Sequence, residues 1–216
     1  MNKEWSELNK TMQAQIKKKD TYKMGIDTLF NLRRQLMQTL VSFKEDLCRE
    51  DFNAIPFINA DGYHSKTIAY SIWHIFRIED IVAHTVITED EQVFFTGNYQ
   101  VRINSPIITT GNELVKQQIA DFSKQLNLEE LYSYIFEVRE STEKILERFS
   151  YDELKFPDER KGYLKSLNVV NCDEKAIWLI DYWCSKDIRG LIQMPFSRHW
   201  IMHTEACLRI KNKMHS

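Results

Sequence analysis

TIAYSIWHIFRIED, residues 67–80, is the centre of a segment that runs from Ser65 to Val86 without a glycine or a proline. Projected as a helix at about 100° per residue, the segment is apolar around most of its circumference. The apolar residues are Ile68, Ala69, Tyr70, Ile72, Trp73, Ile75, Phe76, Ile78, Ile81 and Val82. A helix of this kind is covered by neighbours on every side. The segment therefore predicts the central helix of a bundle.

Further long helices are expected around this segment. Apolar residues recur at spacings of three and four over residues 26–51 and 128–149, and a last helix begins after Pro195 and continues to the C-terminus. Residues 173–186 predict a shorter apolar helix. Only 6 Gly and 4 Pro occur in the 216 residues, which favours helices over strands and turns. The predicted fold is an all-α four-helix bundle with additional short helices in its connections.

Residues 1–216 are interpreted as one domain, with residues 1–20 as an N-terminal helical arm. The arm is expected to be either a separate helix or a continuation of the next one, because its apolar residues also follow helical spacing: Trp5, Leu8, Met12 and Ile16.

Three connections are expected to interrupt the long helices. Residues 53–62 and 94–110 predict loops, and residues 157–171 predict a looser segment. Asparagines are common N-caps, so Asn112 is expected to open a short helix that ends near Leu126, and Asn127 the long helix that follows. Ser150 and Glu153 have the spacing of a capping box.

Charge and composition exclude several classes of function. The 29 basic and 31 acidic residues are dispersed, so the chain lacks the basic footprint of a protein that binds nucleic acid or an anionic membrane. The N-terminus is too polar for a secretory signal, and no apolar run approaches the roughly 20 residues of a membrane span. A cytosolic protein is expected. The four cysteines lack a C-x-x-C spacing, which predicts reduced, mostly buried thiols.

His199 and His203 lie one turn apart in MPFSRHWIMHTEACLRI, residues 194–210. Their side chains project roughly 40° apart on one helical face, so both imidazoles could reach one divalent ion. The same face is apolar and is expected to point inward, since it also carries Phe196, Ala206, Cys207 and Ile210. Cys207 is expected to be a small core residue. Taken alone, the pair fits core or surface histidines held by ordinary hydrogen bonds better than a metal site.

A metal site needs at least one more ligand from another helix, and His74 is the best candidate. It projects among Thr67, Tyr70, Ile78, Ile81 and Thr85, on an interior face of its helix. His84 projects on the polar side of the same helix, His64 falls in a loop and His215 lies at the C-terminus. These three histidines are therefore not expected to be ligands.

The segment TIAYSIWHIFRIED together with the late His-x-x-x-His resembles the DinB/YfiT-like superfamily over most of the chain. The resemblance implies a four-helix bundle in which His74 of the second helix and His199 and His203 of the last helix bind a divalent metal ion in an open site. Many members carry Gly-Gln soon after the last histidine, where this chain has Thr204-Glu205-Ala206.

Three imidazoles suit zinc, nickel, iron or copper and leave a position for water or substrate. The leading hypothesis is a metal-dependent enzyme that activates water or a thiol, of the hydrolase or thiol S-transferase type; its partners would be a small-molecule substrate, including a low-molecular-weight thiol, and a second copy of the chain in a homodimer. The alternative is a non-enzymatic, stress-linked binding protein with a vestigial or structural site.

Other chemistry-bearing residues are expected to be structural. Glu79 projects roughly 140° and Asp80 about 120° from His74, so salt bridges with Arg77 or with a neighbouring helix are predicted for them. Asp181 is expected to face outward, although a role in holding a ligand imidazole remains open. Core packing is favoured over a place around the metal for the tryptophans Trp73, Trp178, Trp183 and Trp200.

Overall fold

The computed structural model of the protein describes residues 2–155, 164 and 167–215. All regular structure over these residues is helical, and they contain no β-strand. The prediction of an all-α chain is confirmed for the described residues. Much of the looser segment predicted over residues 157–171 lies outside them.

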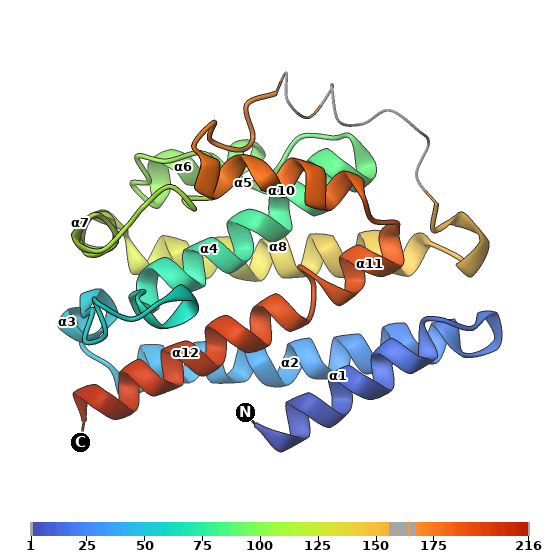
Figure 1. The fold of residues 1–216 in the computed structure, drawn as a ribbon, viewed down its shortest axis with the longest axis horizontal. Coiled ribbons are helices and arrows are strands. Elements are labelled where there is room, and N and C mark those ends of the chain that lie inside the picture. The colour runs from blue at the N-terminus through green and yellow to red at the C-terminus, as the bar shows by residue number, and fades with distance from the viewer. Residues whose placement is uncertain (1, 156–163, 165–166, 216) are drawn as a thin grey trace.

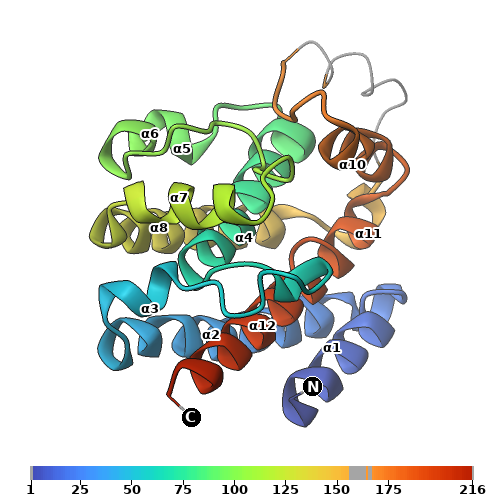
Figure 2. The same ribbon diagram turned by 60° about the vertical axis from the view of Figure 1, so that its left-hand side comes forward.

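Four long helices form the centre of the molecule: α2 (Tyr22–Asp46), α4 (Ile68–Asp80), α8 (Leu128–Arg148) and α12 (Arg198–Met214). Helix α4 packs against α8 and α12, and α2 packs against the same two helices (Figure 1). The view turned by 60° shows the same neighbours (Figure 2). Each of these helices lies within a few residues of its predicted position. Asn127 caps α8 as predicted, because its side chain accepts hydrogen bonds from the amides of Glu129 and Glu130.

Helix α4 is the most buried element. Every residue from Ile68 to Asp80 is buried, which confirms the prediction of a central helix. Thr67 caps its start by accepting a hydrogen bond from the amide of Tyr70. The helix continues as a π-helical stretch, η3 (Ile81–Thr88), and ends at Glu89, which adopts a left-handed backbone with φ of 58°.

Helix α1 (Lys3–Gln15) is a separate helix that lies along α2, which settles the question left open for the N-terminal arm (Figure 1). Its predicted apolar stripe faces inward, since Trp5, Met12 and Ile16 are buried. The two helices approach closely at Gly25, where an added Cβ would lie 2.6 Å from Cγ2 of Ile16. Glycine at this position therefore permits the contact.

Shorter helices connect and cover the long ones. They are η1 (Lys19–Thr21), α3 (Arg49–Asn53), η2 (Gly62–His64), α5 (Val93–Thr96), α6 (Tyr99–Arg102), α7 (Gln117–Gln125), η4 (Tyr151–Glu153), α10 (Glu174–Cys184) and α11 (Ile188–Gln193). Ser150 and Glu153 form the predicted capping box at η4. Helix α10 corresponds to the predicted apolar helix over residues 173–186.

Two expectations about the connections were wrong. The loop predicted over residues 94–110 contains α6 and most of α5, because Phe94 and Tyr99 bury their rings in the core beside α8. Asn112 does not cap a helix, since α7 begins at Gln117 and no side chain caps it. Tertiary burial of Phe94 and Tyr99 decided the first case, and a short window of sequence does not report it.

A buried ion pair joins α4 to two other helices. Nη2 and Nη1 of Arg33 donate to Glu79 at 2.6 and 2.9 Å, and Nε1 of Trp200 donates to the same carboxylate at 2.8 Å. The side chains of Arg33 and Glu79 are fully buried. Glu79 is thus paired with a neighbouring helix, as predicted.

Asp80 and Arg77 form a second buried network. Asp80 accepts hydrogen bonds from Tyr134 of α8, from Arg77 and from the amides of Val93 and Phe94. Arg77 also donates to the carbonyl oxygen of Ile108 at 2.5 Å. The network fixes α8, α5 and the connection after α6 against α4.

The cysteines are less buried than predicted. None of the four cysteines forms a disulfide, as predicted, but Cys48 and Cys172 are exposed rather than buried, and of the four only Cys207 is fully enclosed. Among the described residues, no helix combines the length and the apolar character that a membrane span requires.

The buried ion pair predicts a large effect of Arg33→Met on stability. The substitution leaves the charge of Glu79 buried without its cation, which should lower the free energy of unfolding by about 3–5 kcal/mol. Urea denaturation measures this change. Lys144→Met, which breaks an exposed pair with Glu140, is the control and should leave the free energy nearly unchanged. Equal effects of the two substitutions would contradict the assigned role of the pair.

Candidate metal centre

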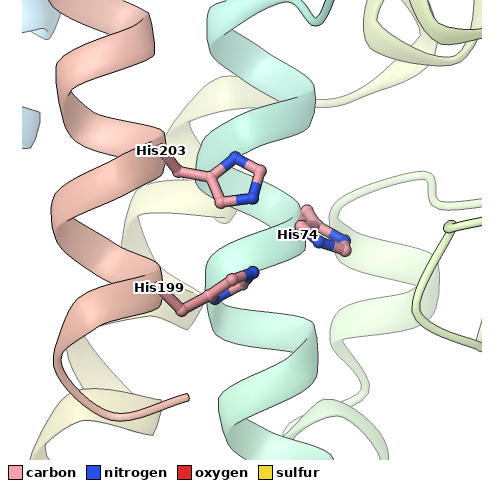
Figure 3. Close-up of side chains that lie close together, drawn as sticks. All are labelled: His74, His199 and His203. Carbon is pink, nitrogen blue, oxygen red and sulfur yellow. The ribbon is translucent and has the colours of Figure 1, made fainter. Parts of the chain in front are cut away.

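His74, His199 and His203 converge between α4 and α12 (Figure 3). His74 comes from the middle of α4, and the other two come from successive turns at the start of α12. All three are buried, and one ring nitrogen from each lies within 4.8 Å of the others. The ring centroids are 4.6 to 5.2 Å apart. The structure thus brings together the three histidines singled out in the sequence, in a group that could hold a metal ion.

The orientation of His74 is fixed by the backbone. Its Nδ1 lies 2.7 Å from the carbonyl oxygen of Thr110. A carbonyl only accepts, so Nδ1 carries the proton and the lone pair of the neutral ring is on Nε2. The ring of Tyr70 stacks on the imidazole with an interplanar angle of 13°, and its hydroxyl donates to the carbonyl of Gly111. A hydrogen bond from the second ring nitrogen to a carbonyl is typical of histidines that bind metals.

His199 and His203 lack such partners. The Nδ1 atom of each is buried and forms no hydrogen bond with any described group. Buried nitrogens without partners are costly, and a metal ion is one way to satisfy the lone pairs of two neighbouring imidazoles. Burial, and to a smaller extent the proximity of the other imidazoles of the cluster, holds the pKa of both well below the ordinary value. The rings are therefore neutral near pH 7, as metal ligands must be.

The spacing of the imidazoles fits a metal after a small rotation of the side chains. Two nitrogens bound at 2.0–2.1 Å to a tetrahedral zinc ion lie about 3.4 Å apart. The nitrogens of the cluster are up to 4.8 Å apart, so rotations that close up to about 1.4 Å complete the set. The number, type and burial of the donors suit a three-histidine site.

A pocket of about 340 Å³ opens onto the three imidazoles. Most of the remaining wall is apolar or aromatic and comes from η2, α4, α10, the connection before α7 and the connection before α12: Gly62, Tyr63, Lys66, Tyr70, Ile78, Asn112, Trp178, Leu179, Tyr182, Trp183, Met194 and Pro195. Within this described lining there is no carboxylate. The arrangement leaves room for a small molecule beside the histidines.

The other histidines lie elsewhere. His84 is not part of the cluster, as predicted, but it is buried rather than on a polar surface. Residues after η3 fold over it, and its ring bonds with Asp90 at 2.6 Å and Ser141 at 2.9 Å. His64 contacts Arg209, and His215 pairs with Asp51.

Cys207, Asp181 and the tryptophans were expected to be structural, and this holds for most of them. Cys207 is enclosed in the core, and burial raises the pKa of its thiol to about 12. Asp181 is exposed on α10. Trp73 and Trp200 belong to the core, whereas Trp178 and Trp183 line the pocket, so the preference for core packing was wrong for Trp178.

Sequence reasoning missed several residues of the site. Thr110 contributes a backbone oxygen, which no side-chain pattern reports. Tyr63 places its ring edge-on against His203, with 4.8 Å between the centroids, and Lys66 lies in the wall of the pocket. In the sequence, the position of Lys66 immediately before the cap of α4 indicates that it lies near the start of the helix that carries His74.

Comparisons with known proteins add no relative. No model of a protein family matches the chain, and no curated protein matches it either. The assignment of a function therefore depends on the site.

The buried imidazoles predict that the metal-free protein loses stability in acid. Burial lowers the pKa of His74 from 6.5 to about 4, so between these values the unfolded chain binds more protons than the folded one. The contribution of this histidine to the free energy of unfolding is full above about pH 6.5 and falls as the pH decreases towards 4. Between pH 7.5 and 4.5, His74 alone should account for about 2–3 kcal/mol.

Urea unfolding with a chelator present, at both pH values, measures this loss. The matched variant combines His74→Gln, His199→Gln and His203→Gln, and it should lose less stability over the same interval. An equal loss in the variant and the wild type would show that the cluster does not control the acid sensitivity.

Proposed function

We propose that the protein is a divalent-metal-binding helical bundle of the DinB/YfiT-like type and acts as a metal-dependent enzyme. In this proposal α2, α4, α8 and α12 are the four helices of the bundle, and His74, His199 and His203 are the ligands. A metal ion bound there would lower the pKa of a water or a thiol at its open position.

One observation carries the proposal. Three buried, neutral imidazoles from two helices meet in the lining of a pocket, and two of them have a buried nitrogen without a partner among the described residues. Histidines that only fill a core satisfy both ring nitrogens with protein groups, as His84 does. A pocket beside the cluster favours a catalytic site over a closed structural one.

The donor set favours particular metals. Three neutral imidazoles suit zinc, nickel, iron and copper, whereas magnesium and calcium prefer oxygen ligands. The hydrogen bond from His74 to the carbonyl of Thr110 raises the basicity of the ring and holds its orientation. Zinc, nickel and iron are the metals proposed.

The described residues of the pocket wall favour attack by a thiol on an electrophilic substrate over hydrolysis. Zinc hydrolases of the His-Glu-x-x-His type use a nearby carboxylate as a general base, and no described lining residue supplies one. Glu79 and Asp80 are held by Arg33 and Arg77 in buried networks. A thiol needs only a lowered pKa to become a nucleophile. We therefore place a thiol S-transferase first and a hydrolase second.

Metal content tests the ligand set. Protein purified without chelator and supplied with zinc or nickel should hold one ion per chain, measured by elemental analysis. His74→Ala and His203→Ala should each lose most of it, because two imidazoles do not complete the site. His84→Ala is the matched control, a buried histidine on the continuation of the same helix, and should retain the metal. A metal-free wild type whose melting temperature does not respond to chelation would refute the site.

Turnover separates an enzyme from a binding protein. Low-molecular-weight thiols are screened with electrophilic acceptors, and esters and amides are tested in parallel on the metal-loaded protein. Any activity found should fall to the uncatalysed rate in His74→Ala and persist in His84→Ala. Retention of activity by His74→Ala would place the chemistry away from the metal.

A further inference from the structure

Lys66 is a cation in the wall of the pocket beside the three histidines, and none of the described residues of that wall is acidic. It immediately precedes Thr67, the cap of α4, and its Nζ lies 5.2 Å from the centroid of the Tyr70 ring. Lys175 is the one described charged residue that shifts the pKa of Lys66, and it is another cation. No described residue of the lining thus balances the positive charge in this wall.

The surroundings of Lys66 disfavour its protonated, charged form. Burial, and to a smaller extent Lys175, lowers the pKa of its ammonium group. The field of Lys66 also contributes to the low pKa of His74 and His203, so it reaches the metal ligands. A partly buried cation is costly unless an opposite charge accompanies it. An anion in the pocket would supply that charge.

The rest of the pocket is suited to an apolar body. Trp178 is 48% exposed, a high value for so large a ring, and its Nε1 is already used in a hydrogen bond to the carbonyl of Lys175. Trp183, Tyr182 and Leu179 from the same helix extend this apolar wall. The one described side-chain oxygen of the lining that is buried without a partner is Oδ1 of Asn112.

We infer that the pocket binds a small organic anion whose charged group pairs with Lys66 and whose apolar body packs against Trp178 and Trp183. The volume of about 340 Å³ lies within the range of pockets that take small molecules. This inference rests on the proposed function for the presence of a metal beside the ligand. It adds the class of substrate: an anionic molecule with an aromatic or other apolar portion.

Binding of naphthalene-2-sulfonate tests the inference by isothermal titration calorimetry. A sulfonate is a weak ligand for divalent metals, so its binding reports on Lys66 rather than on the ion. The uncharged counterpart is 2-(methylsulfonyl)naphthalene, which has the same ring. The wild type should bind the anion at least tenfold more tightly than the neutral molecule.

Three variants assign the effect to one ammonium group. Lys66→Met should weaken binding of the anion about tenfold and change that of the neutral compound less than twofold. Lys66→Arg should restore most of the affinity for the anion. Lys175→Met, a neighbouring lysine with the same change of charge, should have less than a twofold effect. Equal losses in Lys66→Met and Lys175→Met, or equal binding of the two probes, would overturn the inference, as would failure of the anion to bind.

The titrations are made on zinc-loaded and chelator-treated protein. If no metal binds but the dependence on Lys66 persists, the proposed function fails and the anion pocket stands. If metal binds and Lys66→Met has no effect, the anion pocket fails and the proposed function stands. Circular dichroism and melting temperature confirm that each variant is folded.

Discussion

The burial of α4 on all sides is the constraint on which the rest of the structure depends. Thirteen residues of this helix are buried, and among them are charged and polar side chains that need partners within the protein. Glu79 finds Arg33 of α2 and Trp200 of α12, and Asp80 finds Tyr134 of α8. These bonds set the positions of the helices around α4. The helix that is buried along its whole length is therefore also the one that orders its neighbours through polar bonds.

The histidine cluster is one of the places in the interior where buried polar atoms lack partners. His74 satisfies one nitrogen with the carbonyl of Thr110, and the opposing imidazoles of His199 and His203 each leave a buried nitrogen without a partner. Three neutral rings held together in a protein interior gain little from one another, since each prefers an acceptor, a donor or a metal ion. Their convergence beside a pocket that also contains Lys66 is an arrangement that packing alone does not require.

Much of this could be predicted from the sequence, because helical periodicity reports which face of a helix a residue occupies. It placed His74, His199 and His203 on interior faces and separated them from Glu79. Periodicity does not report what covers a face from elsewhere in the chain. The neighbours of His84 on its helix are polar and predict a polar surface, yet the side chain is buried and its ring bonds with Asp90 and with Ser141 of α8. The carbonyl of Thr110 reaches His74 through a connection anchored to Arg77, and only the folded chain shows this.

Coordination of one metal ion by three imidazoles is the central claim, and X-ray absorption spectroscopy at the edge of the bound metal tests it most directly. For the zinc-loaded protein, the expected spectrum has about three nitrogen ligands at 2.0–2.1 Å with the outer-shell scattering of imidazole rings. His203→Ala should lose one of them. A first shell that contains sulfur at about 2.3 Å, or oxygen alone without imidazole scattering, would contradict the assignment.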